Sequence, residues 1–195
     1  MGYKYFPVNV GHWVVYSVDS ISYDDFTGNI DSFHFQIKEK IESVFYDNEG
    51  RETQRLERYK RNSDTSQWVI KDVWVINLTK ATAEKTEENI RLVKLVFPPS
   101  KNVEWDGNLY NYNGPQTYKY MSLYSPYSIN NITFDSTIIV LQKQEATLIS
   151  EKQEIEVYAS HVGMVYKKYV DLTKEPTGVI TKGVDYTYTL ISFGN

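Results

Sequence analysis

Residues 184–190 read Val-Asp-Tyr-Thr-Tyr-Thr-Leu, an unbroken alternation of apolar and polar side chains. Successive side chains of a β-strand point to opposite faces of its sheet, so this stretch predicts a strand with one face on a core and the other in water. The same period of two returns along most of the chain, beginning with residues 11–23, and many of the 17 tyrosines fall within it. The pattern therefore predicts an all-β protein.

Short turns rich in Asp, Asn and Gly, such as 47–50, separate the expected strands. A helical turn competes only at 81–89, where no apolar stripe has helical spacing, so a hairpin is predicted there. Residues 98–115 are expected to form the longest irregular segment. The strands are expected near 11–23, 32–46, 51–61, 67–79, 85–97, 116–124, 134–143, 146–150, 154–159, 163–173 and 184–193.

About ten strands joined by short turns predict an antiparallel meander. Because twist accumulates across such a sheet and open edges invite aggregation, a strongly curved sheet, either a barrel or a half-barrel, is the favoured architecture. A β-sandwich is the alternative. No internal repeat or Ser/Gly/Pro linker divides the chain, and its length suits one β domain spanning residues 1–195.

Composition excludes several classes of protein. The net charge of -4 and pI near 5.4 argue against a nucleic-acid partner, which requires a clustered basic surface. The chain has no cysteine, which excludes disulfides, cysteine catalysis and Cys-based metal sites. Residues 51–61 are rich in basic side chains, but nearby acids offset them and predict a solvated, cross-strand-paired face. These basic residues are Arg51, Arg55, Arg58, Lys60 and Arg61.

Catalytic motifs are missing from the sequence. His12, His34 and His161 lie far apart and have no metal-ligand spacing. No Gly-x-Ser-x-Gly turn, phosphate-binding loop or dinucleotide fingerprint occurs. No catalytic residue, metal or cofactor is therefore assigned, and a non-enzymatic role is favoured. A carboxylate-dependent hydrolase stays open as an alternative, because a pair of catalytic carboxylates is recognised only by its separation in space.

The segment 105–112 is the candidate ligand site, because rings interleaved with amides suit a sugar or another polar ligand with an apolar face. The competing interpretation is a well-packed loop in which Trp105 covers one barrel end and Gly107-Asn108 makes a turn. Trp13 and Trp74 are weaker candidates, since their positions in strands favour core packing. The candidate residues are Trp105, Asn108, Tyr110, Asn111 and Tyr112.

Three motifs carry a family resemblance. They are Gly-His-Trp-Val-Val-Tyr at 11–16, Phe97-Pro98 followed by Trp-Asp-Gly-Asn at 105–108, and Tyr-Ala-Ser-His-Val-Gly-Met-Val at 158–165. In this order the chain resembles uncharacterised secreted lipoproteins of Gram-negative bacteria, which share Gly-x-Trp-x-x-Tyr, Trp-x-Gly-Asn and Tyr-Ala-x-x-Val-Gly-x-Val. The resemblance implies a curved antiparallel sheet and an envelope location, and no activity. Gly163 suits a bulge or a strand entry.

The lack of cysteine, the mild acidity and the resemblance together predict an exported protein, periplasmic or an outer-membrane lipoprotein. No apolar run reaches the roughly 20 residues that cross a membrane, so membrane contact is expected only through a removed lipid anchor. Met1-Gly2 followed directly by strand-like sequence suits a start that replaces a removed leader.

The predicted function is a non-enzymatic binding or structural module for a lipid, a glycan or another small ligand. A scaffold component of an envelope assembly is a further alternative to the hydrolase. Neither the ligand nor the oligomeric state follows from the sequence.

Overall fold

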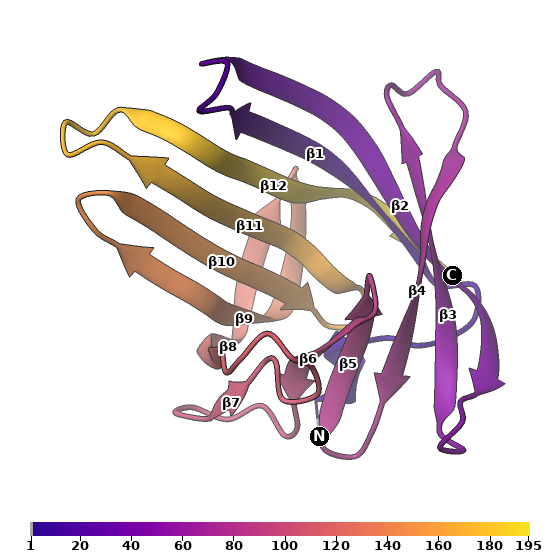
Figure 1. Ribbon diagram of the computed structural model, residues 1–195. Helices are drawn as coiled ribbons and strands as arrows, with labels where there is room; N and C mark the ends of the chain where they lie inside the picture. Colours follow the sequence, from indigo (N-terminus) through magenta and orange to yellow (C-terminus); the bar gives the residue numbers. More distant parts are fainter. Residues whose placement is uncertain (1) are drawn as a thin grey trace.

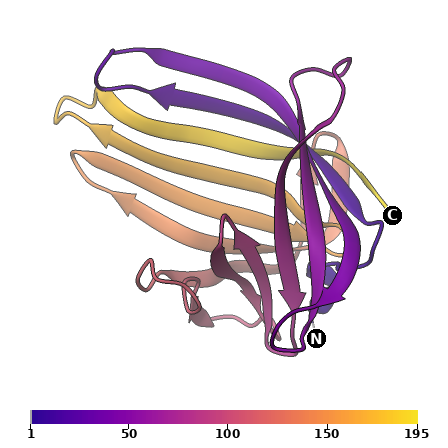
Figure 2. The same cartoon turned by 45° about the vertical axis from the view of Figure 1, so that its right-hand side comes forward.

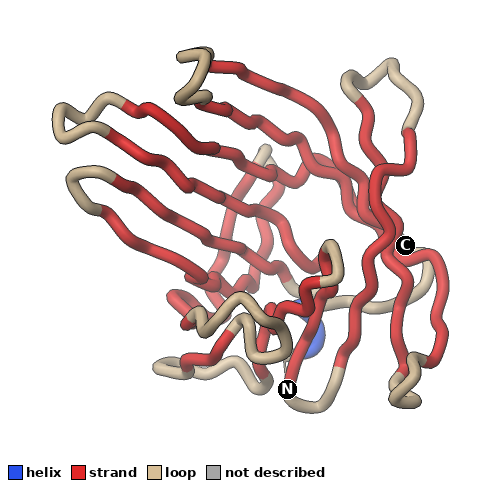
Figure 3. Tube along the Cα trace, viewed as in Figure 1, coloured by secondary structure: helices blue, strands red, loops and turns tan. Residues whose placement is uncertain are grey.

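The computed structural model describes residues 2–195, which form twelve β-strands and one short 3-10 turn (Figure 3). Met1, part of the start interpreted above, lies outside the described residues. The elements are η1 (Tyr3–Tyr5), β1 (Trp13–Tyr23), β2 (Ile30–Tyr46), β3 (Glu52–Arg61), β4 (Val69–Leu78), β5 (Thr82–Glu87), β6 (Ile90–Val96), β7 (Glu104–Asp106), β8 (Thr117–Ile129), β9 (Ile132–Ala146), β10 (Ser150–Ala159), β11 (Gly163–Lys174) and β12 (Ile180–Gly194).

All twelve strands belong to one antiparallel sheet in the order β6-β5-β4-β3-β2-β1-β12-β11-β10-β9-β8-β7. The first strand pairs with the last, so the two free edges are mid-chain strands, β6 and β7. The sheet curls into a nearly closed barrel (Figures 1 and 2). The predicted curved meander is confirmed, with twelve strands instead of about ten.

A hairpin instead of a helix at 81–89 is confirmed as β5–β6. The single strand expected at 85–97 is wrong, because Glu88 and Asn89 form the turn of this hairpin in the left-handed region (φ 48° and 64°) and separate β5 from β6. Two further strand predictions need correction. Residues 150–159 are one strand, not two, because the break falls at the turn 147–149. Strand β8 continues beyond 124 through Pro126, which the sheet tolerates because the pairing register shifts there, between Ser125 and Tyr127.

The free edges face each other across what we call the seam, where β6 meets β7 and the loop 107–116. Among residues 2–195, one backbone bond crosses it, from Val93 N to Gly107 O at 2.8 Å. Side chains form further hydrogen bonds across the seam. For example, Trp105 Nε1 donates to Val93 O at 2.9 Å, and the Tyr120 hydroxyl donates to Val96 O at 2.6 Å. Polar edge groups are thus satisfied without a continuous ladder, which limits pairing with other chains.

The N-terminal segment packs into the barrel. The Tyr5 ring is fully buried, and its hydroxyl lies 2.7 Å from Ser136 Oγ on β9. Phe6 is also buried and contacts Tyr158 of β10, with ring centres 6.3 Å apart. This segment closes part of the interior and leaves a hollow region between the two halves of the sheet.

Candidate functional site

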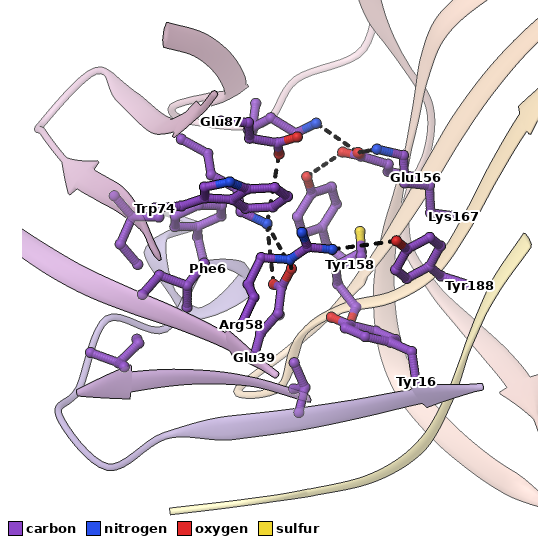
Figure 4. Close-up of a pocket in the computed structure, with 18 of the residues that line it drawn as sticks. Phe6, Tyr16, Glu39, Arg58, Trp74, Glu87, Glu156, Tyr158, Lys167 and Tyr188 are labelled. Carbon is purple, nitrogen blue, oxygen red and sulfur yellow. Dashed lines mark hydrogen bonds and ion pairs between the residues drawn. The ribbon is translucent and has the colours of Figure 1, made fainter. Parts of the chain in front are cut away.

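A cavity of about 200 Å³ lies inside the sheet (Figure 4). Strands β1–β6 contribute one side, strands β10–β12 the other, and Phe6 and Pro7 of the N-terminal segment complete the wall. Because inward-facing residues alternate with outward-facing ones along each strand, several strands present two inward side chains two residues apart. Leu56 and Arg58 on β3 and Tyr186 and Tyr188 on β12 are examples.

Aromatic rings form much of the wall. Tyr188 makes edge-to-face contacts with Tyr16 and with Tyr186, each at 5.7 Å between ring centres. Burial raises the pKa of Tyr16 and of Tyr158 well above the ordinary value, and burial raises that of Tyr186 to about 12. These phenols therefore stay neutral at physiological pH, and their rings form part of the cavity wall.

Arg58 is the centre of one polar group, the Arg58 cluster, which contains Arg58, Glu39, Asp72, Lys85 and Glu87. Its guanidinium donates to Glu39 at 3.0 Å, to Asp72 at 2.6 Å and to the Tyr188 hydroxyl at 3.3 Å. It also lies 3.6 Å from the centre of the Trp74 ring (Figure 4). Lys85 bonds Glu39 at 3.1 Å and lies 3.7 Å from Glu87.

The position of Arg58 corrects the prediction for residues 51–61. Only 5% of its side-chain surface is exposed, because Arg58 shares the inner face of β3 with Leu56. The solvated, paired face that was predicted does describe Arg55, which is half-exposed between Glu42 and Glu57.

The second polar group, the Glu156 cluster, contains Glu156, Lys94, Gln142, Tyr158 and Lys167. Lys94 donates to Glu156 Oε1 at 2.6 Å, whereas Gln142 and Tyr158 donate to Oε2 at 2.8 and 2.5 Å. The Lys167 ammonium lies 3.5 Å from Oε1. Burial alone would raise the pKa of Glu156, but the two lysines and the hydrogen bonds outweigh it and lower that pKa to about 2. The carboxylate therefore stays ionised.

The five predicted site residues are placed elsewhere. Trp105 packs against the Tyr120 ring at 4.8 Å and belongs to the seam. Asn108 is buried and bonds Gly114 O, and Asn111 donates to Arg91 O, again across the seam. The ring of Tyr110 lies under the Arg91 guanidinium at 4.3 Å, and Tyr112 is 85% exposed. The cavity within residues 2–195 is lined by other side chains, so a ligand site on this loop stays a prediction.

Trp74, a weaker ligand candidate in the sequence for which core packing was favoured, both packs against the core and lines the cavity. The charged wall itself was missed. A signal for it existed in β2, where Ile37 and Ile41 mark the buried phase and Glu39 falls between them. A carboxylate at such a position requires an internal cation, because an unpaired buried charge is too costly.

The histidines take separate positions. His12 is buried, with its ring nitrogens 2.7 Å from Asn195 Oδ1 and 3.0 Å from Val162 O, whereas His34 is exposed beside Asp19. Within residues 2–195, no group of three or more His, Asp or Glu side chains is arranged to hold a metal ion. None of the helical structure described for 2–195 has the length and apolar character to span a membrane.

Two solved structures share this fold over nearly the whole chain. One is a "putative lipoprotein from Parabacteroides distasonis ATCC 8503", with a TM-score of 0.52, 11% identity, and 97% of this chain and 98% of that chain covered. The other is a "putative exported protein with YmcC-like fold" from Bacteroides fragilis NCTC 9343, with a TM-score of 0.52, 8% identity and the same coverage. No protein-family model and no curated protein matches the chain. At these identities the likeness shows the fold.

Two of the three motifs behind the resemblance meet at the cavity. Residues His12, Val14 and Tyr16 of the first motif line the cavity, as do Tyr158 and the range 162–164 of the last. Gly163 begins β11 with φ 88°, as its expected role at a strand entry requires. The middle motif, which contains Trp105, lies at the seam.

Proposed function

We propose that this is an exported, envelope-associated protein that binds a small ligand inside its curved sheet. The observation that carries the proposal is the cavity, which combines aromatic faces with fixed polar groups, the usual composition of a small-molecule site.

Cavity size limits the ligand. About 200 Å³ lies below the roughly 300–1,000 Å³ typical of drug-sized pockets, and somewhat above the roughly 150 Å³ cavity that accepts benzene. Among the ligands predicted from sequence, this volume favours a single sugar ring, a single aromatic ring or a short acyl chain over a complete lipid.

The ionisation of Glu87 and Glu156 favours binding over hydrolysis. A glycosidase-type mechanism needs one carboxyl with a raised pKa to act as the general acid. Burial would raise the pKa of Glu87, but Lys85, Lys167 and Lys94 outweigh it and lower that pKa, and the pKa of Glu156 is about 2. Neither group keeps a proton to donate at neutral pH.

Binding is tested by thermal unfolding against a panel of single-ring and short-chain compounds. A ligand at ten times its Kd raises the free energy of unfolding by about 1.4 kcal/mol. Met164→Phe adds a ring to the cavity wall and should abolish the stabilisation, whereas Met121→Phe, on an exposed position of β8, should preserve it. If no compound stabilises the protein, or if both variants respond alike, the cavity is not a binding site.

The export proposal draws on the fold neighbours, one described as a putative lipoprotein and the other as a putative exported protein. Fractionation of the native host with an antibody to this protein provides the test. Recovery in the envelope or periplasmic fraction supports export, and recovery with a cytoplasmic marker refutes it.

A further inference from the structure

Among the cations that line the cavity, Lys167 makes the weakest polar interactions with other protein groups. It lies on β11, and 18% of its side-chain surface is exposed, facing the cavity. Within residues 2–195 its ammonium makes no hydrogen bond, and its ion pair with Glu156 is long, at 3.5 Å. An ammonium has three N–H donors, so Lys167 keeps donors that a bound molecule can use.

Glu156 has three partners closer than Lys167. Its Oε1 accepts from Lys94 at 2.6 Å, and its Oε2 accepts from Gln142 and Tyr158. One carboxylate is therefore neutralised and hydrogen-bonded before Lys167 is counted, and Lys167 adds a second positive charge beside it. Burial alone would lower the pKa of Lys167, but Glu156, Tyr186 and Glu87 hold it well above the ordinary value, so the ammonium stays charged.

The charge of the whole cavity agrees with this local excess. Five basic residues line it against three acidic ones, and Asp72, which pairs with two of the basic residues, brings the acids to four. One positive charge remains. Glu154 lies two residues before Glu156 on β10, outside the residues that line the cavity; burial raises its pKa, whereas Lys167 and Lys94 lower it. The lining residues are Arg58, Lys71, Lys85, Lys94 and Lys167, and Glu39, Glu87 and Glu156.

We infer that the ligand is a small organic anion with one ring or short chain, and that the Lys167 ammonium binds its anionic group. This inference rests on the proposed binding function. The ring of Tyr186 lies 5.9 Å from the ammonium, so an apolar body attached to the anion would meet an aromatic face directly beside the charge. A carboxylate and a phosphate monoester share this chemistry; the single excess charge favours the monoanionic carboxylate.

The test is calorimetric titration of the whole chain with benzoate, phenyl phosphate and the neutral isostere benzamide. Benzoate should bind at least tenfold more tightly than benzamide, which equals about 1.4 kcal/mol. Lys167→Met, which keeps the chain length without the charge, should weaken benzoate at least tenfold and leave benzamide unchanged. Lys168→Met is the matched control, because the neighbouring Lys168 is absent from the cavity wall and pairs with Asp185; it should bind like the wild type.

Equal affinity for benzoate and benzamide, or unchanged benzoate affinity in Lys167→Met, overturns the anion inference while cavity binding stands. If only neutral or cationic fragments bind, the anion inference is likewise overturned and cavity binding stands. If phenyl phosphate binds more tightly than benzoate and depends on Lys167, the anion inference holds and the carboxylate preference is wrong. If nothing enters the cavity, the binding function fails together with the inference. The wild-type comparison of the two isosteres decides the matter even if Lys167→Met does not fold.

Discussion

Glu156 offers the sharpest test of the charged interior. Its side chain is almost completely buried, and its four partners come from four strands: Lys94 from β6, Gln142 from β9, Tyr158 from β10 and Lys167 from β11. We expect Glu156→Gln, which keeps the shape and removes the charge, to destabilise the protein strongly. The loss arises because Lys94, itself buried, would then lack a counter-ion.

The size of the effect follows from the pKa. Folding lowers the pKa of Glu156 from 4.5 to about 2, and each pKa unit corresponds to 1.36 kcal/mol, so the ionised form contributes about 3 kcal/mol. Removal of one partner of a buried ion pair typically costs about 3–5 kcal/mol, which agrees. Because the pKa is lower in the folded state, this stability is complete above pH 4.5 and is lost as the pH falls towards 2.

The measurement is urea unfolding followed by tryptophan fluorescence between pH 2.5 and 7. The difference between the wild type and Glu156→Gln should be about 3 kcal/mol at neutral pH, constant down to about pH 5, and smaller at each lower pH. Glu145→Gln, at a half-exposed carboxylate on β9 that pairs with Lys143, is the control and should change stability by less than about 1 kcal/mol. A Glu156→Gln variant as stable as this control, or a pH-independent difference, would refute the reasoning.

Five further variants test other parts of the fold by the same urea unfolding. Trp105→Ala should cost about 3 kcal/mol, because the bond and ring packing that close the seam are lost; Tyr112→Ser, on the same loop but exposed, should stay within about 0.5 kcal/mol. Gly183→Ala should cost at least about 2 kcal/mol, since its φ is 124° and a Cβ would lie 2.0 Å from Asp171 O. Arg58→Met should cost about 3–5 kcal/mol through the carboxylates it leaves behind, and Arg58→Lys should recover part of this loss. Equal effects of the two Arg58 variants would contradict the charge argument.

The fold was predictable because its determinants are local. Alternation of apolar and polar residues identifies a strand, and turns such as 47–50 identify the reversals, so the order of hairpins along the chain follows directly. How the sheet closes on itself was harder to predict from the sequence. The pairing of β1 with β12 and the gap between β6 and β7 depend on contacts between residues far apart in sequence, which no local pattern encodes.

The site was harder to predict for the same reason. Lys94, Glu156 and Lys167 lie on three strands, and a single charged residue in an alternating strand is normally solvent-facing. The aromatic loop 105–112 attracted attention by composition, yet its rings and amides include those that bond the β6 edge. Aromatic rings and amide groups can bond and pack against a sheet edge as well as bind a sugar, so composition alone does not distinguish the two roles.

The energetics of the interior support the proposed binding role over a purely structural one. Buried ion pairs repay their desolvation poorly, and replacing them with apolar residues of similar volume is often neutral or stabilising by about 1–4 kcal/mol. On this ground a barrel that served only as a scaffold would be at least as stable with apolar residues in place of Arg58, Lys94, Glu156 and their partners. A ligand that uses the fixed cations, by contrast, meets donors already held in place and loses less entropy on binding. The charged, hollow interior is therefore better explained by recognition of a polar ligand than by stability of the sheet.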